Sequence, residues 1–145
     1  LKGAGAPQPR TETVDCPELG GAVICRGLLA SEAFAVASLR SQALRRVREA
    51  RAEHAAAQRE GQPPTPFEPP ELDFDELRAY GRYISHLLAC GVTVANGLQL
   101  WSAEEWEVAG QQHPALMDRL QAVVERLSGM GNEEDVRKNL PPIPS

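Results

Sequence analysis

The pattern of apolar and polar positions along this 145-residue chain predicts a mainly α-helical fold. Three segments place apolar residues three and four positions apart, the spacing of one helix face. The stripes are Val36, Leu39, Ala43, Val47 and Ala50; Leu77, Tyr80, Ile84, Leu87 and Leu88; and Leu116, Leu120, Val123, Val124 and Leu127. We expect these stripes to meet in one helical core.

Local signals predict where each helix begins and ends. Ser31 is a candidate N-cap for a long helix that continues to about Arg59. Phe34, Ala37 and Leu44 widen its apolar face, whereas alanines are the only apolar residues after Ala50, so we expect the second half to project or to contact a partner. The other signals are capping boxes at Asp73/Glu76 and Ser102/Glu105, Pro114 in a first turn, and Gly129 or Gly131 as a C-terminal cap.

Two short β-hairpins are also expected. The segments "TETVDC" and "AVICRG" alternate apolar and polar residues on either side of "PELGG", whose glycines suit a turn. The segment "VTVANGLQLW" predicts a second, very small hairpin or an extended turn around Asn96-Gly97. Gly81, inside the second long helix, suggests either a close helix crossing or a tolerated residue that is unfavourable in a helix.

Composition shifts divide the chain into a single domain and two flexible ends. Residues 1–10 are predicted to be a flexible lead-in, 11–131 one helical domain, and 132–145 a flexible C-terminal tail. Inside the domain, residues 60–70 hold five prolines in "EGQPPTPFEPP", which excludes a helix and predicts a semi-rigid loop.

Charge and hydropathy narrow the classes of partner. Residues 1–60 carry nine Lys/Arg and seven Asp/Glu, whereas residues 61–145 carry six and thirteen. An acidic C-terminal half argues against nucleic-acid binding. We expect no membrane span and no signal peptide, because no apolar run approaches the roughly 20 residues that a span requires. A soluble, intracellular protein is predicted.

Catalytic and metal-binding motifs are not recognisable. Cys16, Cys25 and Cys90 are an odd number of thiols, expected to be reduced, although Cys16 and Cys25 could face each other across the first hairpin. His86 and Cys90 have a ligand spacing, but two residues do not make a zinc site. The carboxylates of "EEWE" suit a helix start better than acid–base catalysis. We therefore predict no enzyme activity, no metal and no cofactor.

The aromatic and aliphatic residues near position 100 are the candidate partner-binding residues. Tryptophan is enriched at interfaces, and Trp101 and Trp106 lie five apart, a spacing that does not direct both toward one core. At least one of them could therefore lie at an interface, whereas core packing is the commoner role for either one alone. The predicted partner-binding set is Trp101, Trp106, Leu98 and Leu100.

Several stretches resemble the tail assembly chaperones of long-tailed, siphovirus-type bacteriophages and their prophages. The order is a hairpin ending in "VICRGLLASEAF", a long Arg/Ala helix, a proline-rich loop, "SAEEWEVAG" and a helix ending in "VVERLSGMGNEEDVRKN". The resemblance covers about residues 13–139, and "RGLLASE" and "RLSG...EDVRKN" are its most telling parts.

The resemblance implies a protein that binds and solubilises the tape measure protein in the host cytoplasm and is absent from the mature virion. It also implies a longer, frameshifted form that recruits tail tube protein, so that "GNEEDVRKNLPPIPS" would end the short form. Self-association stays open. A head–tail connector or other helical adaptor is the alternative, whereas a helical transcription regulator would need a basic recognition helix that the acidic half does not supply.

Overall fold

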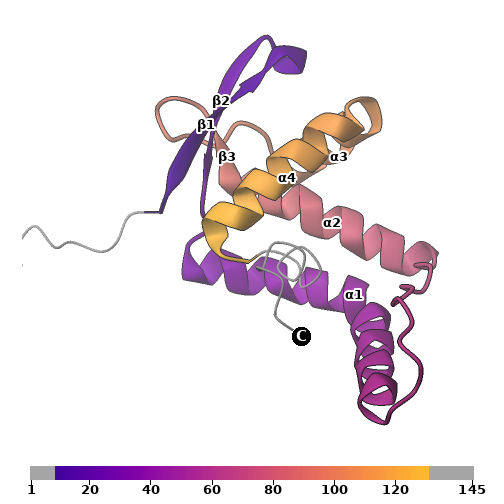
Figure 1. Ribbon diagram of the computed structural model, residues 1–145. Coiled ribbons are helices and arrows are strands. Elements are labelled where there is room, and N and C mark those ends of the chain that lie inside the picture. The colour runs from indigo at the N-terminus through magenta and orange to yellow at the C-terminus, as the bar shows by residue number, and fades with distance from the viewer. Residues whose placement is uncertain (1–8, 131–145) are drawn as a thin grey trace, which may run out of the picture.

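The computed structural model describes residues 9–130, and within them the predicted mainly helical fold is confirmed. The elements, in chain order, are β1 (Thr11–Cys16), the 3-10 helix η1 (Pro17–Leu19), β2 (Gly21–Arg26), α1 (Ala30–Arg59), α2 (Phe74–Gly91), β3 (Val92–Thr93), α3 (Ala103–Gln112) and α4 (Pro114–Ser128). Figure 1 shows the sheet at one end of the molecule, with α4 beside the hairpin and α1 passing below α2. Residues 1–8 of the predicted lead-in and the predicted tail 132–145 lie outside the described part of the chain.

Both predicted hairpins are present. β1 and β2 pair antiparallel along their whole length, and η1 with Gly20 (φ 78°) makes the turn between them. β3 adds to the other side of β2 and begins the second, very small hairpin. There the Val94 N–H donates to the Leu98 carbonyl at 2.9 Å, and Gly97 adopts φ 83°.

The register of the first hairpin corrects the expectation for its cysteines. Cys25 pairs with Glu12, and Cys16 pairs with Gly21, so the two thiols do not face each other across the strands. Both side chains are buried and free rather than joined in a disulfide.

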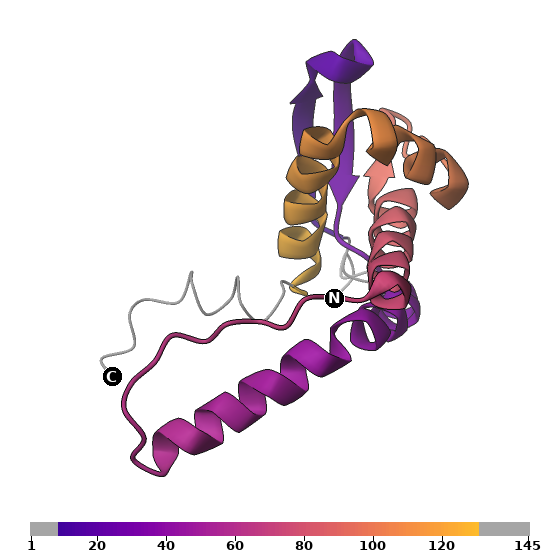
Figure 2. The same cartoon turned by 90° about the vertical axis from the view of Figure 1, so that its right-hand side faces the viewer.

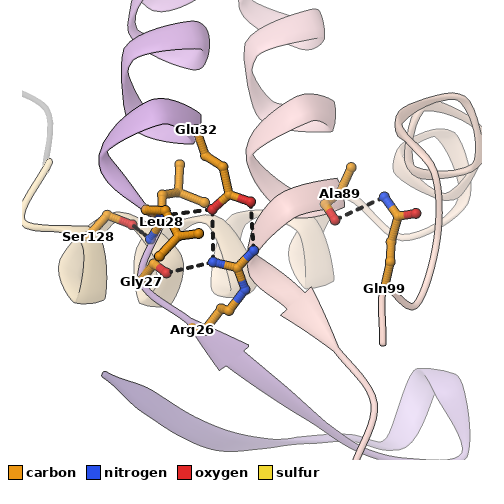
Figure 3. A network of polar contacts seen from close by, with 8 residues as sticks. Arg26, Gly27, Leu28, Glu32, Ala89, Gln99 and Ser128 are labelled. Atoms are coloured by element: carbon orange, nitrogen blue, oxygen red, sulfur yellow. Dashed lines mark hydrogen bonds and ion pairs between the residues drawn. The ribbon is translucent and has the colours of Figure 1, made fainter. Parts of the chain in front are cut away.

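The helix α1 begins two residues earlier than predicted, because a carboxylate rather than the Ser31 hydroxyl caps it. Leu29 is the N-cap, and its N–H donates to Glu32 Oε1 at 2.9 Å. The Arg26 guanidinium donates to both oxygens of the same carboxylate, at 2.9 and 2.8 Å (Figure 3). This bond to Arg26 holds the pKa of Glu32 below its usual value. Glu32 thus ties the start of α1 to the end of β2.

Only part of the apolar face predicted for α1 is buried. Val36 and Ala43 lie in the core, but Phe34 is 83% exposed and Ala37 is exposed as well. Among the elements of residues 9–130, α2 alone makes an extensive contact with α1. One neighbour covers a narrow stripe, so the widening predicted from Phe34 and Ala37 is wrong.

The second half of α1 projects from the body, as predicted, and the proline-rich loop returns alongside it (Figures 1 and 2). We call residues 46–73 the arm. The Arg51 guanidinium carbon lies over the ring of Phe67, in the loop, 4.4 Å from the ring centroid. The same ring makes an edge contact with His54. The loop is therefore attached to the helix by the Phe67 ring and by polar contacts. His54 Nε2 lies 2.8 Å from the Thr65 carbonyl oxygen, and Gln58 Nε2 donates to the Pro63 carbonyl at 3.2 Å.

The helix α2 is the centre of the core and packs against α1, α3 and α4. The fully buried large side chains are Trp106, Tyr83, Leu87, Leu88, Leu116, Leu120, Val92 and Val124. The predicted stripe of α2 is right at Leu87 and Leu88 but wrong at Leu77, which is 56% exposed because α3 and α4 do not reach the first turns of α2.

Close approaches in the core occur at two glycines that the sequence analysis did not single out. A Cβ at Gly91 would overlap Val124 Cγ1, and a Cβ at Gly27 would lie 2.5 Å from the Leu127 carbonyl oxygen. Around Gly81, in contrast, a Cβ would meet no heavy atom of the described residues within 4 Å. The close helix crossing expected at Gly81 is therefore wrong for the helices of this domain.

We call the contact between residues 26–32 and residues 124–128 the joint (Figure 3). Besides the approach of Gly27 to Leu127, the Leu28 N–H donates to Ser128 Oγ at 2.9 Å, and Ser128 Oγ donates to the Val124 carbonyl at 2.7 Å. The segments "RGLLASE" and "RLSG", about 100 residues apart, thus form one contact in the fold.

A buried polar network links α2 to α4. The Tyr83 hydroxyl donates to Glu125 Oε2 at 2.5 Å, and Gln121 Nε2 donates to the same oxygen at 3.2 Å and to the Tyr80 hydroxyl at 3.0 Å. Burial, together with the bond to Glu125, raises the pKa of Tyr83. Because Glu125 is only 4% exposed, its carboxylate depends on these donors.

The remaining helix-end signals are confirmed. The Glu76 N–H donates to Asp73 Oδ1 at 2.8 Å, and the Glu105 N–H donates to Ser102 Oγ at 3.2 Å. The α4 helix begins at Pro114, and Gly129 closes it in the left-handed conformation with φ 69°.

Truncating the core residue Leu120 to Ala should lower the free energy of unfolding by about 2–5 kcal/mol, because Leu120 is fully buried and a cavity would remain. Urea denaturation followed by circular dichroism measures this loss. Leu98→Ala is the matched control; this side chain is 62% exposed, and its loss should stay within about 0.5 kcal/mol. An equally small effect at Leu120 would contradict the packing described above.

Removing the Tyr83 hydroxyl should destabilise the fold by about 1–3 kcal/mol, because a buried carboxylate would lose its closest donor. Tyr83→Phe is the variant, and the free energy of unfolding is the measurement. Adding Glu125→Gln to Tyr83→Phe should recover part of the loss, since the buried charge is then gone. If Tyr83→Phe matches the wild type, the hydrogen bond is not stabilising.

Candidate partner-binding groove

Exposed apolar side chains cluster at the start of α2. Phe74 is 72% exposed and Leu77 is 56% exposed, three residues apart and therefore on neighbouring positions of one helix face. Continuing along α2, the same face carries Gly81 and the half-buried Ile84. Leu29, Phe34, Leu98 and Val108 are also exposed, but none of them lines either of the two depressions described below.

The exposed face of α2 continues into an open groove of about 530 Å³ between α2, α3 and α4. Its lining residues are Arg78, Gly81, Arg82, Ile84, Ser85, Glu107, Gly110, Gln111, Pro114, Met117 and Asp118. Figure 1 shows why it is open: the first turns of α2 diverge from the α3–α4 corner. We call this depression, with Phe74 and Leu77 at its entrance, the α2 groove.

The floor of the α2 groove is apolar and contains two glycines on different helices. Ile84 and Met117 supply the apolar surface, while Gly81 on α2 and Gly110 on α3 present backbone. The space above Gly81 is empty, and Met117 Cε would lie 3.3 Å from a Cβ at Gly110. A glycine inside a helix costs about 1 kcal/mol relative to alanine, and no packing contact of the described residues compensates for Gly81.

The two walls of the groove carry opposite charge. Arg78 and Arg82 belong to the α2 wall, and Glu107 and Asp118 belong to the α3 and α4 wall. None of these four side chains forms an ion pair with another residue between positions 9 and 130. Arg78 instead lies over the Phe74 ring, 5.6 Å from its centroid. The charges are therefore available to a molecule that enters the groove.

A second depression, of about 480 Å³ between α1 and α2, has a different character. Its lining is mostly charged, and Arg46 donates to both oxygens of Glu76 at 2.8 and 2.6 Å. The Arg46 bonds lower the pKa of Glu76 to about 2. Because the Arg46–Glu76 ion pair crosses it and most of its lining is charged, this depression is a polar seam between the helices rather than a second apolar groove. Arg78 and Arg82 line this seam as well as the α2 groove.

The predicted partner-binding residues do not form one exposed surface. Trp106 is fully buried, which corrects its expected place at an interface, and Trp101 is half-buried against it at 4.6 Å between ring centroids. The two rings share one corner of the core, contrary to the expectation from their spacing. Leu100 is half-buried, and Leu98 alone of the set is well exposed, on the second hairpin.

The thiols and His86 lie apart from the groove lining. The pKa of Cys25 is raised by burial to about 12, and burial also raises the pKa of Cys16 and of Cys90. Thiols with raised pKa values are mostly protonated near neutral pH and react slowly. His86 Nδ1 lies 2.8 Å from the Arg82 carbonyl oxygen, and no cluster of three metal-ligating side chains occurs between residues 9 and 130.

Comparison with models of known protein families, with curated proteins and with solved structures finds no match to this chain. Within the described part of the chain, no helix is both long and apolar enough to cross a bilayer.

The α2 groove was not predicted from the sequence, although the spacing of some of its residues indicates a shared helix face. Phe74, Leu77, Gly81 and Ile84 are spaced three, four and three apart, which marks one helix face. The missing information was that α3 and α4 cover only the second half of this face. Gly110 carries no such signal, because it becomes part of the groove only through the α3–α4 corner.

Substituting each α2 glycine with alanine should change stability in opposite directions. Gly81→Ala should stabilise the protein by about 0.5–1 kcal/mol, because the Cβ meets open space and alanine favours the helix. Gly91→Ala should destabilise it by about 1–3 kcal/mol, because the Cβ overlaps Val124. Urea denaturation of the two variants checks the pair, and a destabilising Gly81→Ala would mean that the space above Gly81 is filled.

Proposed function

We propose that this protein is a tail assembly chaperone of a long-tailed phage or prophage, which binds and solubilises helices of the tape measure protein. The α2 groove is the observation that carries the binding activity, because it combines an open apolar floor with charged walls. The identity of the partner rests on the resemblance of "RGLLASE" and "RLSG...EDVRKN" to that family.

The two stretches that carry the resemblance contact each other at the joint. They are far apart in the sequence, yet Leu28 and Ser128 are hydrogen-bonded and Gly27 packs on Leu127. The residues that carry the resemblance in the first stretch, and "RLS" in the second, are thus neighbours in one folded unit. The part of the second stretch that follows Met130 lies outside the described residues.

A groove of this kind suits a chaperone that covers the apolar faces of a helical partner. A long helical tape measure protein exposes apolar faces that aggregate before the tail tube surrounds them. A small protein that accepts an amphipathic helix in a groove covers such a face without covalent chemistry. In this proposal the protein acts in the host cytoplasm, is not an enzyme and leaves before the virion matures. A longer frameshifted form would add the recruitment of tail tube protein.

Co-expression with the tape measure protein of the same genome should keep that protein soluble and should yield a complex on affinity purification. The expected result is at least a several-fold rise in soluble tape measure protein. The matched control is Phe34→Ala, an exposed change on α1 outside the groove lining, which should behave as the wild type.

Two outcomes would contradict the proposed function. One is the absence of a complex with every one of a set of overlapping tape measure fragments. The other is stoichiometric recovery of the protein in purified virions, which a head–tail connector would show and a departing chaperone would not.

A further inference from the structure

We propose that the α2 groove binds one amphipathic helix of defined direction, with a small residue (Ala, Gly or Ser) where it crosses Gly81. The bound helix carries acidic residues on the flank that faces Arg78 and Arg82, and basic residues on the flank that faces Glu107 and Asp118. This inference deepens the proposed function and rests on it for the origin of the helix.

The length of the groove fits a helix rather than a single side chain. Its lining on α2 runs from Arg78 to Ser85, roughly 10 Å along the helix axis, or about two turns. Phe74 and Leu77 extend the apolar face by another turn. A partner helix would meet this surface with apolar residues at the i, i+3, i+4 and i+7 positions.

The empty space at Gly81 defines the centre of the contact. Helix axes usually approach to 8–10 Å, and the separation depends on the side chains at the crossing. A glycine at this point removes the Cβ that would hold the partner away, and the space beside it is open. A small residue on the partner brings the two backbones together and lets its neighbours reach Ile84 and Met117.

The charges on the walls define the direction. A helix with acids on one flank and bases on the other exchanges its flanks when it is turned end for end. Since one wall carries two arginines and the other two carboxylates, only one direction places every charge opposite its complement.

A second copy of this chain does not supply such a helix from α1. The exposed face in the first half of α1 displays Phe34, Ala37 and Ser38. No acidic residue occurs from Ala33 to Arg48, so this face lacks the acidic flank that the α2 wall requires. A foreign helix with both charges fits the groove better.

Three synthetic helical peptides test the charge pattern. They share one apolar stripe with a central Ala and differ in their flanks: Glu on one and Lys on the other, Glu on both, or Lys on both. Fluorescence anisotropy at low salt measures each affinity. The mixed peptide should bind the wild type at least tenfold more tightly than the other two, and added salt should reduce the difference.

Charge reversal of one wall should change the preference. Arg78→Glu with Arg82→Glu makes both walls acidic and should favour the all-Lys peptide by about tenfold. Glu107→Arg with Asp118→Arg should favour the all-Glu peptide to the same extent. Arg45→Glu with Arg59→Glu, two exposed changes outside the groove lining, is the matched control and should leave the order unchanged.

Reversal of all four charges tests the direction itself. This variant keeps the net charge and should keep its affinity for the mixed peptide, but the peptide should lie in the opposite direction. A nitroxide on one end of the peptide would broaden the amide signals near Phe74 in one protein and those near Ser85, at the other end of the α2 lining, in the other. The same end broadened in both proteins would overturn the proposal.

Substitutions at Gly81 test the crossing point. Gly81→Ala and Gly81→Leu should each weaken the mixed peptide at least tenfold while circular dichroism shows a folded protein. A peptide with a central Leu should bind the wild type as weakly. Unchanged affinity in these variants would overturn the proposed close crossing.

The outcomes separate this inference from the proposed function. If the tape measure protein co-purifies equally well with the charge-reversed and Gly81→Leu variants, the groove proposal fails and the chaperone function stands. If the peptide preferences hold but no tape measure fragment binds, the groove stands and the partner is another helical protein. Self-association that Gly81→Leu abolishes, or peptide binding only after residues 132–145 are removed, would overturn the assignment to a foreign helix.

Discussion

The docking of Gly27 against the Leu127 carbonyl is the contact on which the arrangement of this domain depends. At this point the chain leaves the sheet and enters α1, and the last turn of α4 occupies the space that a side chain at position 27 would need. Arg26 and Glu32 then lock the first turn of α1, as Figure 3 shows. Among the elements of residues 9–130, α2 alone contacts α1 extensively. The joint, where α1 begins, therefore sets the direction in which α1 crosses the body.

The joint also positions the α2 groove indirectly. With α4 held at its C-terminal end by Leu28 and farther along by Tyr83 and Tyr80 of α2, its N-terminal end is left to meet α3. The α3–α4 corner stops short of the first turns of α2, so Phe74 and Leu77 remain exposed. An open apolar surface thus results because α3 and α4 cover only part of the length of α2.

Features set by neighbours along the chain were predictable from the sequence, and features set by distant contacts were not. The two capping boxes, Pro114 and the Gly129 cap need only residues within one turn of each other. The prediction that Ser31 caps α1 was wrong, because Arg26, on a strand, binds the Glu32 carboxylate, which then caps the helix. The predicted burial of Phe34 and of Leu77 was wrong for one reason. Periodicity gives the direction of an apolar face but not the length over which another element covers it. The groove shares that limitation, because half of its lining comes from α3 and α4, which no local pattern places beside Gly81.

The position of the joint has a consequence for how the chain matures on the ribosome. Its two halves stand about 100 residues apart, so the hairpin and α1 are synthesised long before the carbonyl and hydroxyl that receive them. Until α4 emerges, α1 and α2 lack the helix that seals their core, and the groove lacks a wall. At a synthesis rate of about 5–20 residues per second, this interval lasts roughly 5–20 seconds. A nascent chain therefore presents neither a closed fold nor a binding surface, and both arise together when its final helix docks.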